Sequence, residues 1–122
     1  MRSKTFVTRT KYKYTVLFGA VTITECRTRE SAVRIPQTIK DYPVTNIGNM
    51  AFGKCAETLE EVTVPNGVEK ICEEAFRDCV ALKRVNLPEG LREIEDDAFA
   101  GCCELSEVEL PEGLTAIGNS AF

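Results

Sequence analysis

Cysteine and carboxylate side chains are the groups in this sequence whose chemistry needs explaining, since it holds six cysteines and nineteen Asp and Glu residues but no histidine. Without histidine there is no Ser-His or Cys-His pair for nucleophilic catalysis and no imidazole metal ligand. No glycine-rich phosphate loop occurs either. The acids are numerous, but none lies at a break in the pattern described below. We therefore expect no enzymatic activity, no cofactor and no metal.

Three cysteines recur at a regular interval, at Cys55, Cys79 and Cys102, and this spacing argues against a metal site. No C-x-x-C pair is present, which disfavours zinc. Stacked strand positions lie roughly 4.8 Å apart, slightly beyond the 3.5–4.5 Å between the Cβ atoms of a disulfide. We therefore expect a ladder of buried thiols. The other cysteines fall outside this interval and are better candidates for exposure, with their pairing left open: Cys26, Cys72 and Cys103.

The acidic triplet Glu95-Asp96-Asp97 could attract a cation. It lacks the ligand spacing of a calcium loop, in which acids alternate along the chain. Asp is also a good N-cap residue for a helical turn. We therefore interpret the triplet as a capped turn with solvated neighbours.

The positions of all these residues follow from an internal repeat. Ala-Phe pairs end at Phe52, Phe76, Phe99 and Phe122, at intervals of 24, 23 and 23 residues. Between them, columns of Leu, Val, Pro, Gly and Ile stay in register, and the stretch L-x-x-V-x-[VL]-P ends in apolar-polar alternation. Alternation predicts a short strand with one buried face. Each repeat should be such a strand, a turn, a second extended piece and a short helical turn.

Local signals indicate where these elements begin and end. Proline has no N–H to donate, so it ends the strand, and Pro-x-Gly fits a type I turn with Pro second and Gly fourth. Asn49, Asp96 and Asn119 are expected N-caps of the helical turns. No repeat can bury its apolar face alone, so the repeats must stack into one continuous core. The sequence thus predicts a mostly β solenoid of about four 23-residue repeats with short helical turns.

Residues 1–31 differ from the repeats. Tyr12, Tyr14 and Val16 alternate, a turn is possible near Phe18, and alternation resumes at Val21, which predicts a β-hairpin. We assign 1–31 to a basic N-terminal segment and a capping β-hairpin, and 32–122 to the repeats, the last incomplete. An expansion within residues 37–42 interrupts the first repeat.

Charge divides the chain in the same way. Residues 1–49 carry nine Lys and Arg against three Asp and Glu, a balance of +6, whereas residues 50–122 carry six against sixteen, a balance of −10. The acidic part argues against nucleic-acid binding. No apolar run approaches the eighteen or so residues of a membrane span, and no secretory signal is visible.

The string that runs from Ile47 through Ala51-Phe52 to Cys55, followed by Leu59 and by Val64-Pro65, resembles the BspA-like leucine-rich repeats. The likeness covers about residues 12–122. It implies a leucine-rich-repeat solenoid, and it implies a bacterial or protozoan surface protein that adheres to host proteins or to other cells. A cell-surface or secreted location follows from the resemblance alone. The absent signal and the stop in mid-repeat lead us to expect a fragment of a longer protein or a degenerate relative.

The outward side chains of the predicted strands are the candidate binding surface, with a protein partner of unknown identity. Opposite charges on neighbouring strands support a sheet, and solenoids also bind partners on such rows, so both roles stay open. The candidate partner-binding residues are Arg34, Glu61, Thr63, Arg84, Asn86, Glu107 and Glu109.

Three hypotheses on function follow. The first is a non-catalytic protein-binding module of a surface or adhesion-type protein. The alternatives are an intracellular scaffold segment and a repeat region attached to an enzyme domain outside this chain. We also expect end-to-end self-association through an uncapped C-terminal end, because unpaired strand edges and exposed apolar side chains invite it.

Overall fold

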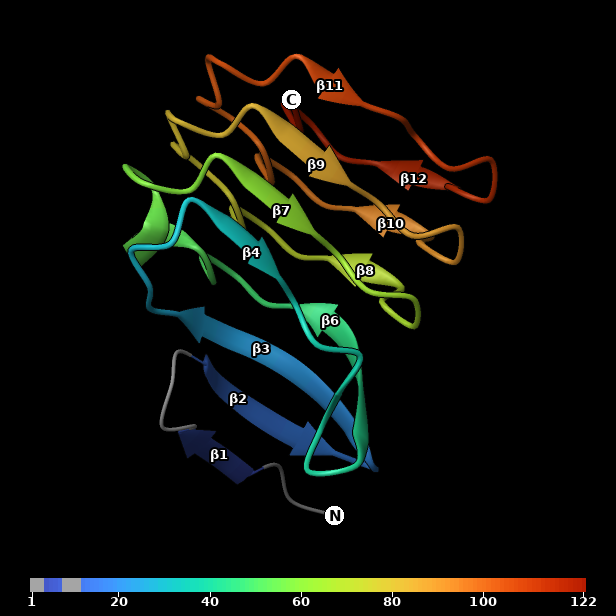
Figure 1. The fold of residues 1–122 in the computed structure, drawn as a ribbon. Helices are drawn as coiled ribbons and strands as arrows, with labels where there is room; N and C mark the ends of the chain where they lie inside the picture. The colour runs from blue at the N-terminus through green and yellow to red at the C-terminus, as the bar shows by residue number, and fades with distance from the viewer. Residues whose placement is uncertain (1–3, 8–11) are drawn as a thin grey trace.

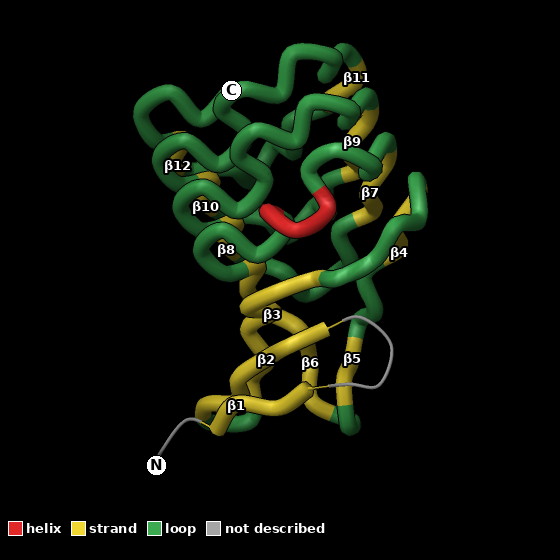
Figure 2. Tube along the Cα trace, turned by 90° about the vertical axis from the view of Figure 1, so that its left-hand side faces the viewer, coloured by secondary structure: helices red, strands yellow, loops and turns green. Residues whose placement is uncertain are grey.

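The fold of the chain is a stack of coils that builds two sheets. The structure, a computed structural model, describes residues 4–7 and 12–122. It is a mostly β solenoid of about four turns with a spacing of about 23 residues, as the repeat predicts. Each coil contributes one strand to each of two sheets on opposite sides of the stack (Figures 1 and 2).

A four-stranded parallel sheet lies on one side, in the order β11-β9-β7-β4. Its strands are short because a proline follows each one closely. The central valines of the first three strands are buried, so the predicted alternation is confirmed. The bounds are β4 (Ala32–Arg34), β7 (Glu61–Thr63), β9 (Arg84–Asn86) and β11 (Glu107–Val108).

The second sheet contains the other extended piece of each coil. Its parallel part runs β6-β8-β10-β12, and the isoleucines Ile47, Ile71 and Ile94 at the ends of the first three strands are fully buried. The bounds are β6 (Tyr42–Ile47), β8 (Lys70–Ile71), β10 (Glu93–Ile94) and β12 (Ala116–Ile117). The expansion in residues 37–42 forms β5 (Thr38–Ile39), which pairs antiparallel with β6.

The predicted N-terminal hairpin is present. It consists of β2 (Tyr12–Leu17) and β3 (Ala20–Cys26), joined through Phe18 and Gly19, which both have positive φ. β3 pairs parallel with β6, so the hairpin extends the second sheet at the N-terminal end, and β1 (Lys4–Val7) adds one more antiparallel strand. Arg2, Arg9 and Lys11 of the expected basic segment lie outside the described residues.

The core is a ribbon of stacked identical positions. Phe52 and Phe76 stack with ring centroids 4.6 Å apart, Phe76 and Phe99 at 5.0 Å, and Phe99 and Phe122 at 5.1 Å. The first three rings are at most 1% exposed. Within the described ranges no polar or charged residue is buried. Burial of large apolar side chains therefore supplies the main stabilisation, at about 1.5–3 kcal/mol for each fully buried residue.

The turns differ from the sequence prediction in three details, the first being that among the described residues only the turn after β6 contains a helical segment. Prolines begin the β-turns instead of occupying the second position, since the amide of Val68 donates to the carbonyl of Pro65 at 3.3 Å and Leu91 donates likewise to Pro88 at 3.2 Å. The expected N-cap at Asn49 is also wrong. The first turn contains a 3-10 helix, η1 (Gly53–Cys55), whose N-cap is Phe52 with no side-chain cap.

Hydrogen bonds between coils explain the missing caps. The residues after the expected cap positions adopt left-handed conformations, among them Met50 at φ 56°, Glu74 at φ 59° and Asp97 at φ 58°. Each donates its amide to a carbonyl in the next coil, as Met50 does to Glu73 at 3.2 Å. Pairing with the neighbouring coil thus satisfies backbone groups that an isolated helical turn would leave to a cap.

At the C-terminal end the last coil leaves apolar side chains open, as the sequence predicts. Leu110 is 48% exposed, Ile117 49% and Phe122 51%, whereas the equivalent residues of inner coils are buried, apart from the partly buried Leu87. We call β11, β12 and these three residues the C-terminal edge. An open edge of this kind is a surface on which another strand can pair.

Candidate binding face

The candidate surface is the outward side of the four-stranded sheet, which we call the strand face. Successive side chains of a strand point to opposite sides, so the residues that flank the inward valines point outward. All seven predicted partner-binding residues belong to this face, together with Ala32. They lie in two rows that cross the strands, and the two rows differ in their electrostatics.

The first row is Ala32, Glu61, Arg84 and Glu107, which are register partners on adjacent strands. Arg84 donates through Nη1 to Glu61 Oε1 at 3.1 Å and through Nε to Glu107 Oε2 at 2.9 Å. The bond to Glu107, followed by the interaction with Glu61, raises the pKa of Arg84 above its usual value. The bond between Arg84 and Glu107 also lowers the pKa of the Glu107 carboxyl. The predicted alternation of charge is confirmed, and the Arg84 guanidinium is bonded to a carboxylate on each neighbouring strand.

The second row is Arg34, Thr63 and Asn86, continued by Glu109 one residue past the end of β11. Asn86 Nδ2 donates to Thr63 Oγ1 at 3.2 Å. Among the described residues, neither Arg34 nor Glu109 has an ion-pair partner, and both are exposed. Within the described part of the chain, the second row therefore has an unpaired cation at one end, an unpaired anion at the other and a neutral hydrogen-bonded pair between them.

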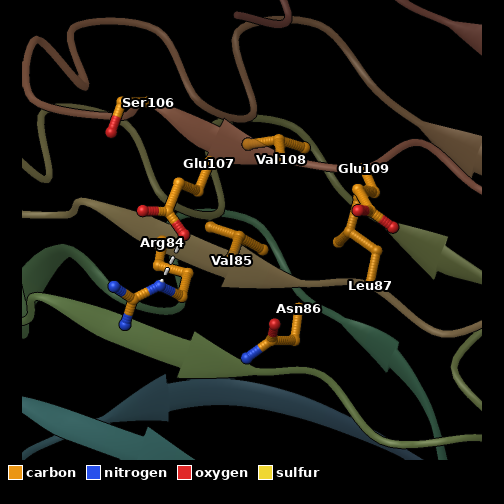
Figure 3. A pocket seen from close by; sticks show the side chains of 8 residues that line it. All are labelled: Arg84, Val85, Asn86, Leu87, Ser106, Glu107, Val108 and Glu109. Carbon is orange, nitrogen blue, oxygen red and sulfur yellow. Dashed lines mark hydrogen bonds and ion pairs between the residues drawn. The ribbon is translucent and has the colours of Figure 1, made fainter.

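Two shallow hollows lie at the ends of this row. One, of about 440 Å³, is lined by Arg34, Gln37, Thr63 and their neighbours. The other, of about 380 Å³, is lined by residues of β9 and β11 together with Glu109. Figure 3 shows Arg84 turned toward Glu107, while Glu109 lies apart from that pair.

The cysteines form the predicted ladder at two of three positions. Cys55 and Cys79 are buried, whereas Cys102 in the last coil is only partly covered. Their thiols donate to backbone carbonyls of the preceding coil, for example Cys102 Sγ to the Phe76 carbonyl at 3.1 Å. Burial raises the pKa of Cys79 to about 12 and that of Cys102 to about 11. These thiols are protonated at neutral pH and are poor nucleophiles or metal ligands.

The expectation for the remaining cysteines is wrong for Cys26 and fits Cys103. Cys26 ends β3 and is fully buried, because the hairpin packs on the first coil and the Cys55 thiol donates to its carbonyl at 3.2 Å. Cys72 is half-buried, and burial raises its pKa to about 11. Cys103 is exposed. All six cysteines carry thiols in this structure.

The acidic triplet is divided between contacts instead of converging on one point. Asp96 Oδ1 accepts a hydrogen bond from the backbone amide of Asn119 in the next coil at 2.7 Å, so it caps a neighbouring coil and not its own turn. Glu95 lies 3.7 Å from Lys70 Nζ. No group of three or more Cys, Asp or Glu within the described ranges could hold a metal ion.

Sequence reasoning missed the outward row of the second sheet. Lys70 lies between Glu93, at 3.8 Å, and Glu95, at 3.7 Å. The signal was available, because Lys70 and Glu93 each precede a repeated isoleucine and must point away from the core. Here, as in the first row of the strand face, a single cation is ion-paired with two carboxylates.

Comparison with known proteins decides the family. A model of the BspA type leucine rich repeat region matches residues 22–122 in six copies. The chain belongs to the BspA-type leucine-rich repeat family. Repeat modules of this kind typically mediate protein interactions, and the family is generally non-catalytic. No curated protein matches the chain.

Solved structures of bacterial leucine-rich repeat proteins share the fold. A leucine-rich repeat protein from T. pallidum is 32% identical over 92% of this chain, with a TM-score of 0.86, and the match spans 53% of that protein. One from Bacteroides capillosus is 31% identical over 95% of this chain and 93% of its own, with a TM-score of 0.81. A leucine rich cell surface protein from Faecalibacterium prausnitzii is 28% identical over 95% of this chain and 33% of its own, with a TM-score of 0.85. The chain thus spans about half of the first of these relatives.

In the described part of the chain, no helix is long and apolar enough to cross a membrane. The strand face is the surface of the solenoid that the sequence predicts as a binding site.

Proposed function

We propose that this chain is a non-catalytic protein-binding module, part of a bacterial surface or adhesion-type protein, and that it binds its partner on the strand face. The observation that carries the proposal is the second row of that face. It offers a cation, Arg34, and an anion, Glu109, that have no ion-pair partner among the described residues, on a parallel sheet with a hollow at each end of the row.

Rigidity of the sheet favours binding. Three of the four strands are fixed by fully or nearly fully buried valines on their inner side, Val108 of β11 is partly buried, and the stacked phenylalanines hold successive coils together. A preorganised surface loses little conformational entropy when it binds a partner. The hairpin, paired through β3 to β6, supports the further proposal that residues 1–31 cap the N-terminal end of the stack. The F. prausnitzii relative, a cell surface protein by its description, supports the surface assignment.

A binding experiment with a matched pair of variants tests the proposal. Extracellular-matrix proteins are immobilised, and the wild-type chain, Asn86→Arg and Asn49→Arg are passed over them. Both asparagines are exposed, but only Asn86 lies on the strand face, while Asn49 lies in a turn that follows β6. We expect micromolar binding that Asn86→Arg weakens at least tenfold and Asn49→Arg leaves unchanged. No binding at micromolar concentration would count heavily against adhesion, and equal effects of both variants would count against the strand face.

The intracellular scaffold is kept as a second candidate because of the thiols. Cys103 is exposed, and an exposed thiol persists in a reducing compartment more readily than outside the cell. Thiol titration of protein purified without reductant, under denaturing conditions, separates the two. Six thiols per chain favour the scaffold, whereas disulfides favour export.

A further inference from the structure

We infer that the partner segment recognised by the strand face is an extended polypeptide that carries an acidic and a basic side chain four residues apart. The inference rests on the proposed function and goes further, because it names the chemistry of the partner. It follows from which charges of the face are already compensated and which are not.

The compensated charges cannot select a partner strongly. Arg84 is bonded to both Glu61 and Glu107, and the flanking pair Lys83 and Glu60 lie 3.5 Å apart. A partner charge that approached these groups would have to displace an existing ion pair, so little would be gained. In the second row, Thr63 and Asn86 share a hydrogen bond and carry no charge. Selection by charge therefore falls to Arg34 and Glu109.

These two residues occupy separate hollows, one lined by Arg34 and the other by Glu109. A shallow hollow can receive the end of a side chain and exclude part of the water around its charge, which strengthens an ion pair relative to a flat surface. The Arg34 hollow suits a carboxylate, and the Glu109 hollow suits a Lys or Arg side chain. Between them the neutral pair offers a polar floor on which a backbone can lie.

Geometry fixes the spacing of the two charges. Arg34 and Glu109 are separated by the three strand intervals from β4 to β11, which is about 14 Å at roughly 4.8 Å per interval. An extended chain advances about 3.4 Å per residue, so it covers this distance in about four residues. Its side chains alternate between two sides, so charges four residues apart point to the same side. Charges three or five residues apart point to opposite sides and cannot enter both hollows.

Peptide binding to the whole chain tests the inference. The probes are labelled ten-residue peptides on a threonine and serine background, with Glu and Lys three, four or five residues apart, and with two Glu or two Lys four apart. Fluorescence anisotropy measures their affinity. We expect the peptide with Glu and Lys four apart to bind about tenfold more tightly than the others, and the preference to shrink at 0.5 M NaCl.

Single charge reversals should change the preference in a predictable direction. Arg34→Glu leaves an anion at both ends and should favour the peptide with two lysines, whereas Glu109→Lys leaves a cation at both ends and should favour the peptide with two glutamates. Arg34→Lys keeps the charge and should keep the wild-type preference. Circular dichroism and the urea midpoint check that each variant folds.

The outcomes separate this inference from the proposed function. Peptides that bind with no dependence on spacing or on the two reversals, yet lose affinity in Asn86→Arg, would overturn the charge rule and leave the strand face as a binding surface. Peptide binding that also ignores Asn86→Arg would overturn both, whereas no binding of any peptide to the wild-type chain or its variants would overturn the inference and leave the proposed function to the matrix-protein experiment.

Discussion

Replacing Phe76 by alanine should remove a large part of the stability of the chain. The ring is fully buried and lies between two others, with Phe52 at 4.6 Å and Phe99 at 5.0 Å. Truncation of a buried Phe to Ala costs about 3–5 kcal/mol, and each aromatic pair contributes about 0.5–1.5 kcal/mol beyond the buried area. Because alanine stacks on neither neighbouring ring, we expect Phe76→Ala to lower the free energy of unfolding by about 4–5 kcal/mol, in the upper part of that range.

Urea unfolding, followed by circular dichroism, measures the loss, and two control variants separate its causes. Phe76→Leu keeps most of the apolar volume but removes the stacking, so it should cost about 1–3 kcal/mol. Phe122→Ala removes a ring that is 51% exposed and stacks on one side only, so it should cost about 1–2 kcal/mol. A loss below about 1 kcal/mol for Phe76→Ala, or a larger loss for Phe122→Ala, would refute the stacked core as the source of stability.

Four further predictions concern the turns, the charged row, the thiols and the end of the stack. Met50→Asn should raise the free energy of unfolding by about 0.5–1 kcal/mol, because the exposed Met50 has φ 56° and Asn tolerates the left-handed region. An unchanged urea midpoint would contradict this prediction. The folded-state pKa of Glu107 is lowered, so its bond to Arg84 stabilises the fold above the unfolded pKa and is lost as pH falls through the folded pKa. The stability difference between wild type and Arg84→Ala should therefore shrink between about pH 7 and pH 3 and in high salt, and a constant difference would argue against the ion pair. With a thiol reagent at about pH 8, the exposed Cys103 should react in the folded chain. Cys79 is buried and has a pKa of about 12, so it should react only on unfolding, and peptide mapping of the labelled sites measures both reactions. The 122-residue chain should self-associate through the C-terminal edge more strongly at high salt, where acid repulsion is screened, and light scattering that shows a monomer at high concentration and high salt would disprove it.

Much of the strand face could be predicted because the repeat imposes a register. Once Val62 and Val85 occupy the same column, Glu61 and Arg84 must be lateral neighbours of opposite charge, and the structure places their charged atoms 3.1 Å apart. The same argument placed Phe52 on Phe76. A period in the sequence becomes a distance in space whenever successive repeats stack directly.

Hydrogen bonds between coils decided what local propensity predicted wrongly. Asn49 has the side chain of an N-cap, but the turn that follows is held by amides that donate to the next coil, so the cap is not needed. Cys26 lies outside the repeat interval, and only the packing of the hairpin on the first coil buries it. Both outcomes depend on contacts between segments that are distant in sequence.

The solenoid, its repeat length, its core columns and the family resemblance all follow from the amino-acid sequence, because each depends on a repeat period that is visible within one chain. Only the tertiary structure divided the strand face into a compensated row and an open one. It showed Arg84 bonded on both sides, and it left Arg34 and Glu109 without ion-pair partners among the described residues. The physical reason is that register tells which side chains are neighbours, whereas the distances between their charged atoms depend on rotamers and strand spacing that exist only after the coils have stacked.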